Sequence, residues 1–260
     1  MKRLGVLLVL FSGLAHADQV EEKVKEQGFY IKLGSGASFA RKAHISASPA
    51  VWDPAVQGYN GSLGTRPIVL GGVGYDSPFV STDITASYRP NFKYSKFQTP
   101  SGSSTPGAIG QKTRRFNLDV SSLMLNLYLN GRGFSALNWK VGKASSIFPF
   151  VGGGVGISQM KIFNFRSTGL PPVDPPQPAF ASENENTIRY RFTYQVMGGL
   201  EYRYRDVCAL SFGYRWFDVS RFKGPRYIRD ENGNAVDVQN NSWKIKFAAN
   251  EAVVEFKIFL

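Results

Sequence analysis

The chain has little cysteine, little histidine and little charge, and its main part lacks a long apolar run. The single cysteine, Cys208, excludes a disulfide scaffold. After residue 15 no run approaches the ~20 apolar residues of a membrane-spanning helix. Charged residues make up 19% of the 260, below the usual quarter, whereas aromatic residues make up 14%. A highly charged disordered chain is therefore excluded.

Residues that commonly carry catalysis are also scarce. Beyond residue 17 the only histidine is His44, and no histidine or cysteine pair has the spacing of metal ligands. No Ser-His-Asp arrangement is indicated, and the glycine motifs for phosphate or dinucleotides are incomplete. We therefore expect no catalytic residue, no metal site and no cofactor, with an outer-leaflet lipid-modifying enzyme as a distant third hypothesis.

Residues 1–17 have the pattern of a secretory signal peptide. Lys2 and Arg3 precede an apolar segment at 4–14, and residues 15–17 read Ala-His-Ala, a small-x-small cleavage site. This pattern predicts export, with residues 18–28 as a short periplasmic segment.

The remainder of the chain alternates in polarity. In residues 188–204 every even position is apolar, aromatic or glycine, whereas the odd positions include Arg189, Arg191 and Glu201. A period of two over this length predicts a long strand with one apolar and one polar face. Strands of soluble proteins usually run about 5–6 residues, and a tilted bilayer-crossing strand needs roughly 9–11. Seven further segments share the pattern: 29–39, 66–75, 79–89, 116–129, 148–162, 207–217 and 243–260.

The predicted connections alternate between long and short. Four long ones cover 40–65, 90–115, 163–186 and 218–242, and two short ones cover 76–78 and 205–206. Long loops on one side and short turns on the other are typical of a transmembrane barrel. The segment 130–147 does not fit, and we expect it to extend its flanking strands or to form a small periplasmic hairpin.

Aromatic residues gather at the predicted strand ends. Two such girdles are expected where amphipathic rings meet the membrane interfaces, although a soluble sandwich of long strands would also carry aromatics. The periplasmic set is Phe29, Tyr75, Phe79, Tyr128, Phe148, Tyr204 and Phe259. The opposite set is Phe39, Tyr88, Phe116, Tyr190, Trp216 and Trp243.

Three strand motifs carry a family resemblance. Residues 123–128 read Leu-Met-Leu-Asn-Leu-Tyr, residues 149–156 Pro-Phe-Val-Gly-Gly-Gly-Val-Gly, and residues 213–218 Gly-Tyr-Arg-Trp-Phe-Asp. In this order they resemble strands of the opacity-type surface proteins and of the membrane domain of outer membrane protein A. The resemblance implies a closed eight-stranded barrel inserted by the outer-membrane assembly machinery. Such proteins usually end in Phe, whereas here Phe259 is followed by Leu260.

These patterns predict an all-β fold: an eight-stranded antiparallel up-and-down transmembrane β-barrel at 29–260, with four long extracellular loops and short periplasmic turns. The expected location is the outer membrane of a Gram-negative bacterium, and the barrel is expected to be a monomer. We expect a surface protein that contacts a host or the environment through its loops. The alternative is a narrow channel for ions or small hydrophobic molecules.

The polar strand faces predict a charged lumen. A charge inside so narrow a barrel is tolerated only if it is paired, so we expect a salt-bridged plug or, alternatively, a gate whose pairs exchange partners. The predicted network comprises Lys32, Asp83, Arg89, Arg189, Arg191, Glu201, Arg203, Arg215, Glu255 and Lys257.

The chain has a net charge of +12, and the predicted loop at 90–115 contributes +5 of it. The predicted second loop carries a basic patch without an acidic residue: Lys93, Lys96, Lys112, Arg114 and Arg115. On an exported barrel we expect such residues to meet lipopolysaccharide phosphates, other outer-membrane lipids, or glycans and proteins of a host surface, and not nucleic acid. Ordinary solvated charge is the competing interpretation.

Overall fold

A computed structural model describes residues 28–40, 44–46, 63–98, 112–142, 144–169, 187–224, 227–229, 235–237 and 244–260. The predicted signal peptide and most of the segment that follows it therefore lie outside the described residues. No helix in the described part of the chain is long and apolar enough to cross a membrane.

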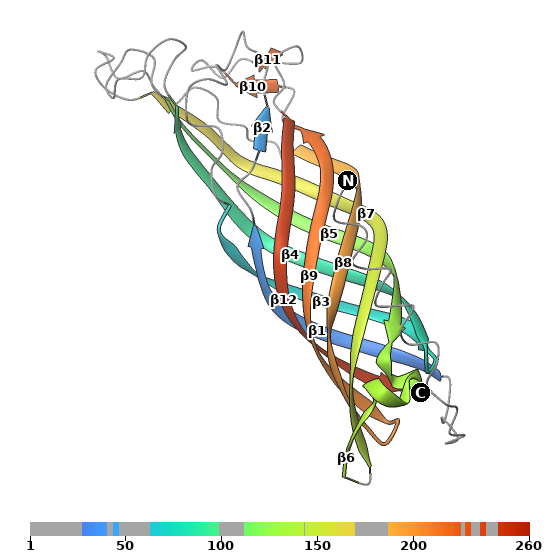
Figure 1. Ribbon diagram of the computed structural model, residues 1–260. Coiled ribbons are helices and arrows are strands. Elements are labelled where there is room, and N and C mark those ends of the chain that lie inside the picture. The colour runs from blue at the N-terminus through green and yellow to red at the C-terminus, as the bar shows by residue number, and fades with distance from the viewer. Residues whose placement is uncertain are drawn as a thin grey trace, which may run out of the picture.

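Eight long strands form one closed antiparallel sheet (Figure 1). Each strand pairs with its neighbour along the chain, and β1 also pairs with β12, from Tyr30 opposite Phe259 to Ala40 opposite Ala249. The predicted eight-stranded antiparallel barrel is confirmed. The strands are β1 (Gly28–Ala40), β3 (Thr65–Asp76), β4 (Val80–Gln98), β5 (Lys112–Asn130), β7 (Ser145–Gly169), β8 (Thr187–Tyr204), β9 (Cys208–Lys223) and β12 (Lys244–Phe259).

Short elements decorate both ends of the barrel. On the side of the long connections, β2 (His44–Ser46) pairs with β12, and β10 (Tyr227–Arg229) pairs with β11 (Ala235–Asp237). At the other end the chain forms the 3-10 turns η1 (Gly131–Gly133) and η2 (Ser135–Leu137). There β6 (Trp139–Val141) pairs with the start of β7 and projects beyond the barrel (Figure 1). The segment 130–147 thus contains the expected small hairpin and also extends a strand.

Several strands continue well past their predicted ends on the long-connection side. The predicted loops 90–115 and 163–186 are therefore wrong in extent, since β4 reaches Gln98 and β7 reaches Gly169. The cause is a bulge in each strand, at Asn91 (φ 55°) and Asn164 (φ 52°). A bulge inserts one residue and shifts the polarity alternation by one position, so the period-two pattern is interrupted where the strand is not.

Asp119 stabilises the first bulge, because its Oδ1 accepts a hydrogen bond from the Asn91 N–H at 2.7 Å. After this bulge β4 again points side chains inward, and Arg89 and Phe92 are both fully buried in the barrel. Asp119 itself lies on the face of β5 that also carries the exposed Leu123, so it is not a lumen residue.

The outward face of the barrel is apolar on all eight strands. Leu123, Ile157 and Phe212 are 57%, 60% and 55% exposed, although a soluble protein would bury such side chains. A contiguous exposed apolar surface of this kind faces lipid. The inward positions between them are small, polar or charged, as in β4, where Ser81, Asp83, Thr85, Ser87 and Arg89 are buried.

The aromatic girdles are only partly as expected. Phe29, Phe79 and Tyr204 are exposed near one end, and Phe39, Tyr88 and Tyr190 near the other. Tyr128, Phe148 and Phe116 were wrongly placed in the girdles, because all three lie on the inward face and are buried. The side chain of Trp243 lies outside the described residues.

Val196 lies on the outward face of β8 and is 53% exposed. We expect Val196→Arg to lower the free energy of unfolding in lipid by about 2–4 kcal/mol, because the charge would enter the apolar belt. Val141→Arg is the matched control: Val141 is also exposed but lies on β6, beyond the barrel end, and should cost less than about 0.5 kcal/mol. Urea unfolding of folded barrels in vesicles measures both, and equal losses would contradict the assigned belt.

Candidate functional site: the charged lumen and the basic hairpin

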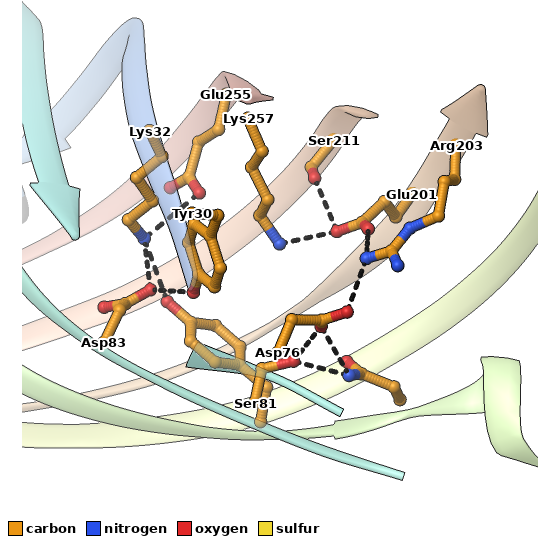
Figure 2. A network of polar contacts seen from close by, with 12 residues as sticks. Tyr30, Lys32, Asp76, Ser81, Asp83, Glu201, Arg203, Ser211, Glu255 and Lys257 are labelled. Carbon is orange, nitrogen blue, oxygen red and sulfur yellow. Dashed lines mark hydrogen bonds and ion pairs between the residues drawn. The ribbon is translucent and has the colours of Figure 1, made fainter. Parts of the chain in front are cut away.

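The lumen near the short turns holds a cluster of acids and bases (Figure 2). Asp76 Oδ2 accepts hydrogen bonds from Arg132 Nη2 at 2.8 Å and from Arg203 Nη2 at 2.7 Å. Arg203 also reaches Glu201 at 3.2 Å, and Glu201 Oε2 pairs with Lys257 Nζ at 2.5 Å. Burial and the neighbouring Arg203 guanidinium lower the pKa of Arg132, which lies in the η1 turn.

A second cluster lies around Lys32. Its Nζ is 2.8 Å from Asp83 Oδ2 and 3.3 Å from Glu255 Oε2, and it donates to the Tyr128 hydroxyl at 3.1 Å (Figure 2). The Tyr30 hydroxyl donates to Asp83 Oδ2 at 2.9 Å. Three strands, β1, β4 and β12, therefore supply the charges, so the cluster links β4 to two strands with which it does not pair.

The third cluster is centred on Glu251. Its carboxylate bridges two guanidinium groups. Arg89 donates hydrogen bonds to both carboxylate oxygens, and Arg215 Nε donates to Oε2 at 2.6 Å. Ser38 Oγ donates to Oε1 at 2.8 Å, and the Arg89 guanidinium lies 3.9 Å from the centre of the Phe217 ring. Arg89 and Glu251 are fully buried, so each charged group is stabilised by the other in place of water.

Beyond Arg89 the lumen changes from charged to apolar. Phe92 packs against Phe247 with ring centres 5.1 Å apart, and Tyr94 stacks on Phe116 at 4.6 Å. Leu118 and Val219 belong to the same buried cluster. This apolar plug fills the part of the barrel that extends towards the long connections. It was not predicted, because the bulge at Asn91 hides which residues of β4 face inward.

Eight residues of the predicted lumen network are buried with ionic partners: Lys32, Asp83, Arg89, Glu201, Arg203, Arg215, Glu255 and Lys257. The other two do not belong to it. Arg189 and Arg191 lie half-buried at the rim and donate to backbone carbonyls, Arg191 to that of Arg221 at 3.2 Å. Their positions on β8 have the same parity as the inward-facing Glu201 and Arg203. However, they lie at the end of the strand towards the long connections, beyond the buried ion pairs.

Sequence reasoning missed three members of the network. Glu251 has the same parity on β12 as Glu255 and Lys257, so the alternation contained the signal for it. Asp76 and Arg132 lie at the short turns, where the alternation of a strand does not predict which way a side chain points. Only the folded chain brings them together.

The basic patch was wrongly predicted to lie in a loop. Strands β4 and β5 continue past the bulge as a paired hairpin, with Lys96 opposite Arg114, Gln98 opposite Lys112, and Ser95 opposite Arg115. Lys93 and Arg115 are exposed. The side chains of Lys96, Lys112 and Arg114 lie outside the described residues. The five basic positions therefore lie on a pair of strands and not in a loop.

Two other residues, His44 and Cys208, were weighed as candidates, and the side chain of His44 lies outside the described residues. Among the described residues no three His, Cys, Asp or Glu side chains are grouped to hold a metal ion. His44 lies in β2, and Cys208 is a half-buried lone thiol at the start of β9.

Comparisons with known proteins give structural likenesses only. No family model matches the chain. No curated protein matches it either. Neisserial surface protein A is 11% identical with a TM-score of 0.44, covering 91% of this chain and 100% of that one. The outer membrane protease OmpT from Escherichia coli is 10% identical with a TM-score of 0.44, covering 90% and 97%.

The attachment invasion locus protein Ail of Yersinia pestis, solved with the heparin analogue sucrose octasulfate, is 8% identical with a TM-score of 0.31. That match covers 88% of this chain and 99% of the other. At these identities and scores, none of the three carries an argument about what this chain does.

The Glu251 cluster provides a stability test. Glu251→Gln would leave Arg89 and Arg215 buried without a counter-charge, so we expect a loss of about 3–5 kcal/mol in the free energy of unfolding. Asp206→Asn is the matched control, because Asp206 is 45% exposed, lies no closer than 3.5 Å to Arg132 and 3.6 Å to Arg203, and has a positive φ that Asn tolerates. It should cost less than about 1 kcal/mol. If Glu251→Gln lowered the free energy of unfolding as little as Asp206→Asn, the lumen would be hydrated and its ion pairs weak.

Proposed function

We propose that this protein is an outer-membrane surface barrel of a Gram-negative bacterium that presents its long-connection side to a host surface or to the environment. The observation that carries the proposal is the extension of β4, β5 and β7 beyond Tyr88 and Tyr190, two exposed aromatic residues of the girdle on that side. A barrel needs no such extension to cross a bilayer, since roughly 9–11 residues per strand suffice.

The extension is built as a scaffold. The apolar plug fills it from within, so the hairpins are supported by packed aromatic side chains. Lys93 and Arg115 stand exposed on its outer surface, and the basic positions 96, 112 and 114 follow towards its tip. A rigid scaffold that displays variable segments is a common way to place binding residues. Basic side chains suit anionic glycans or phosphates as partners.

A narrow channel is the second candidate, and the filled lumen weighs against it. Lys257 pairs with Glu201 at 2.5 Å, Lys32 with Asp83 at 2.8 Å and Arg215 with Glu251 at 2.6 Å, and the apolar plug lies beyond these three clusters. Ion passage would require these pairs to open and the plug to move. A monomeric barrel without catalytic activity is part of the same proposal.

Adhesion tests the surface function. We expect Lys96→Gln/Lys112→Gln/Arg114→Gln to reduce adhesion of expressing cells to an anionic glycan surface by at least about threefold at low salt. The reduction should shrink as salt rises, because the Debye length falls to about 8 Å at physiological ionic strength. The control Arg221→Gln/Lys223→Gln/Lys244→Gln removes three charges from β9 and β12 and should leave adhesion unchanged. Equal adhesion of both variants would contradict the assigned patch.

Conductance distinguishes the channel. We expect the refolded barrel in a planar bilayer to give no steady single-channel openings, because its lumen is filled by paired charges and aromatic side chains. Regular openings that Arg89→Ala makes larger would favour the channel.

A further inference from the structure

The outward face of the barrel carries a groove within the lipid-facing belt. It has a volume of about 860 Å³ and runs across β1, β3, β4, β5, β7 and β8. Small residues Gly71 and Ala86 are paired across β3 and β4, between the larger side chains of Leu33 and Leu123. Because neighbouring outward positions carry large apolar groups, this stretch of small residues leaves a hollow lined by hydrocarbon.

The groove is bordered by polar groups on the side of the long connections. Tyr88, Ser121, Gln159 and Tyr190 occupy one continuous row of paired positions across four strands. Gln159 Nε2 donates to the Tyr190 hydroxyl at 2.8 Å, and the Tyr88 hydroxyl donates to Asp119 Oδ2 at 3.2 Å. Hydroxyl and amide groups at this level suit the region where acyl chains join a polar headgroup.

Basic side chains stand directly beyond this row. Lys161 is the next outward residue after Gln159 on β7, about 7 Å further along the strand. Lys93 and Arg115 lie further along the same outer face of β4 and β5, at positions four and six residues of β5 beyond Ser121, or about 13 and 20 Å. Among the described residues, no carboxylate lies within 4.0 Å of these three cationic groups, although Lys161 Nζ lies 5.7 Å from the Phe163 ring centre.

Among the described residues, the acid opposite Lys161 in the register of β5 and β7 is Asp119, and its carboxylate accepts hydrogen bonds from other groups. Asp119 accepts the Asn91 N–H at 2.7 Å on one oxygen and the Tyr88 hydroxyl on the other. Three basic side chains with no acidic partner among the described residues therefore lie beyond the polar border of an apolar groove, on the side of the long connections. A ligand that matches both parts carries hydrocarbon chains at one end and negative charge at the other.

We propose that this groove is a binding site for a phosphorylated glycolipid of the outer leaflet, of the lipid A type. Its acyl chains lie along Leu33, Gly71 and Ala86, and its phosphates pair with Lys93, Lys161 and Arg115. The orientation rests on the proposed outer-membrane location. The groove spans six strands, a width that suits several acyl chains side by side.

Lipid binding is measured on the refolded full-length barrel in detergent. Bis-phosphorylated lipid A is titrated, and the retained lipid is counted by native mass spectrometry. We expect a one-to-one complex that survives detergent. Lys93→Gln/Arg115→Gln/Lys161→Gln should bind at least about tenfold more weakly, since each basic residue near an anionic headgroup contributes severalfold. The control Arg221→Gln/Lys223→Gln/Lys244→Gln, on the opposite side of the barrel, should change binding less than about twofold.

Two further tests distinguish lipid binding in the groove from unspecific electrostatic attraction to the barrel. Ala86→Trp fills the groove, whereas Ala252→Trp adds the same volume at an exposed outward position of β12. The first should weaken binding and the second should not. Lipid A without its phosphates should bind the unmodified barrel as weakly as bis-phosphorylated lipid A binds the Lys93, Arg115 and Lys161 variant.

Equal effects of the two charge variants, or equal retention of phosphorylated and dephosphorylated lipid A, would overturn the proposed site. The groove would then hold only the unspecific lipid that surrounds a membrane barrel. The hairpin positions 96, 112 and 114 are intact in every variant of this experiment. A failure of lipid binding is therefore distinguishable from a failure of the proposed adhesion.

Discussion

Hydrogen bonding of the backbone within the membrane constrains the whole molecule. In lipid every N–H and C=O must find a partner inside the protein, and a sheet achieves this only by closing on itself. Here the pairing of β1 with β12 removes both free edges. Closure then divides the side chains into an outer set that meets lipid and an inner set that fills a narrow lumen. The alternation along β8 is the direct consequence.

The inner side chains meet a similar requirement, because each buried charged group needs a partner inside the protein. Lys32 lies between Asp83 and Glu255, and Glu251 lies between Arg89 and Arg215, so buried charge is paired with opposite charge. Close approach of the strands leaves little room between these groups. At Gly154 of β7, an added Cβ would collide with the amide of Asn126, which donates to Asp83 at 2.7 Å. The glycine-rich run of β7 is thus part of the charge network.

The sequence predicts much of this fold because lipid enforces a period of two. Val80, Ile84 and Tyr88 alternate with Ser81, Asp83 and Arg89, and the structure places the first set outside and the second inside. The bulges at Asn91 and Asn164 were not predictable, because a single inserted residue ends the alternation without ending the strand. The partner of each charge was not predictable either. Lys32 and Asp83 meet across strands that are paired only through β3, and their contact depends on the register of the closed barrel.

The most direct measurement is the environment of each side chain of β8 in a bilayer. Nitroxide labels are placed singly from position 192 to 200 of the reconstituted barrel, after Cys208→Ser removes the only native thiol. In a closed barrel of this kind, collision with dissolved oxygen should alternate with a period of two and be high at the outward positions Phe192, Tyr194, Val196 and Leu200. It should be low at Thr193 and Gln195, which are buried. A uniform or inverted pattern would contradict a closed barrel with an apolar outer face and a filled lumen.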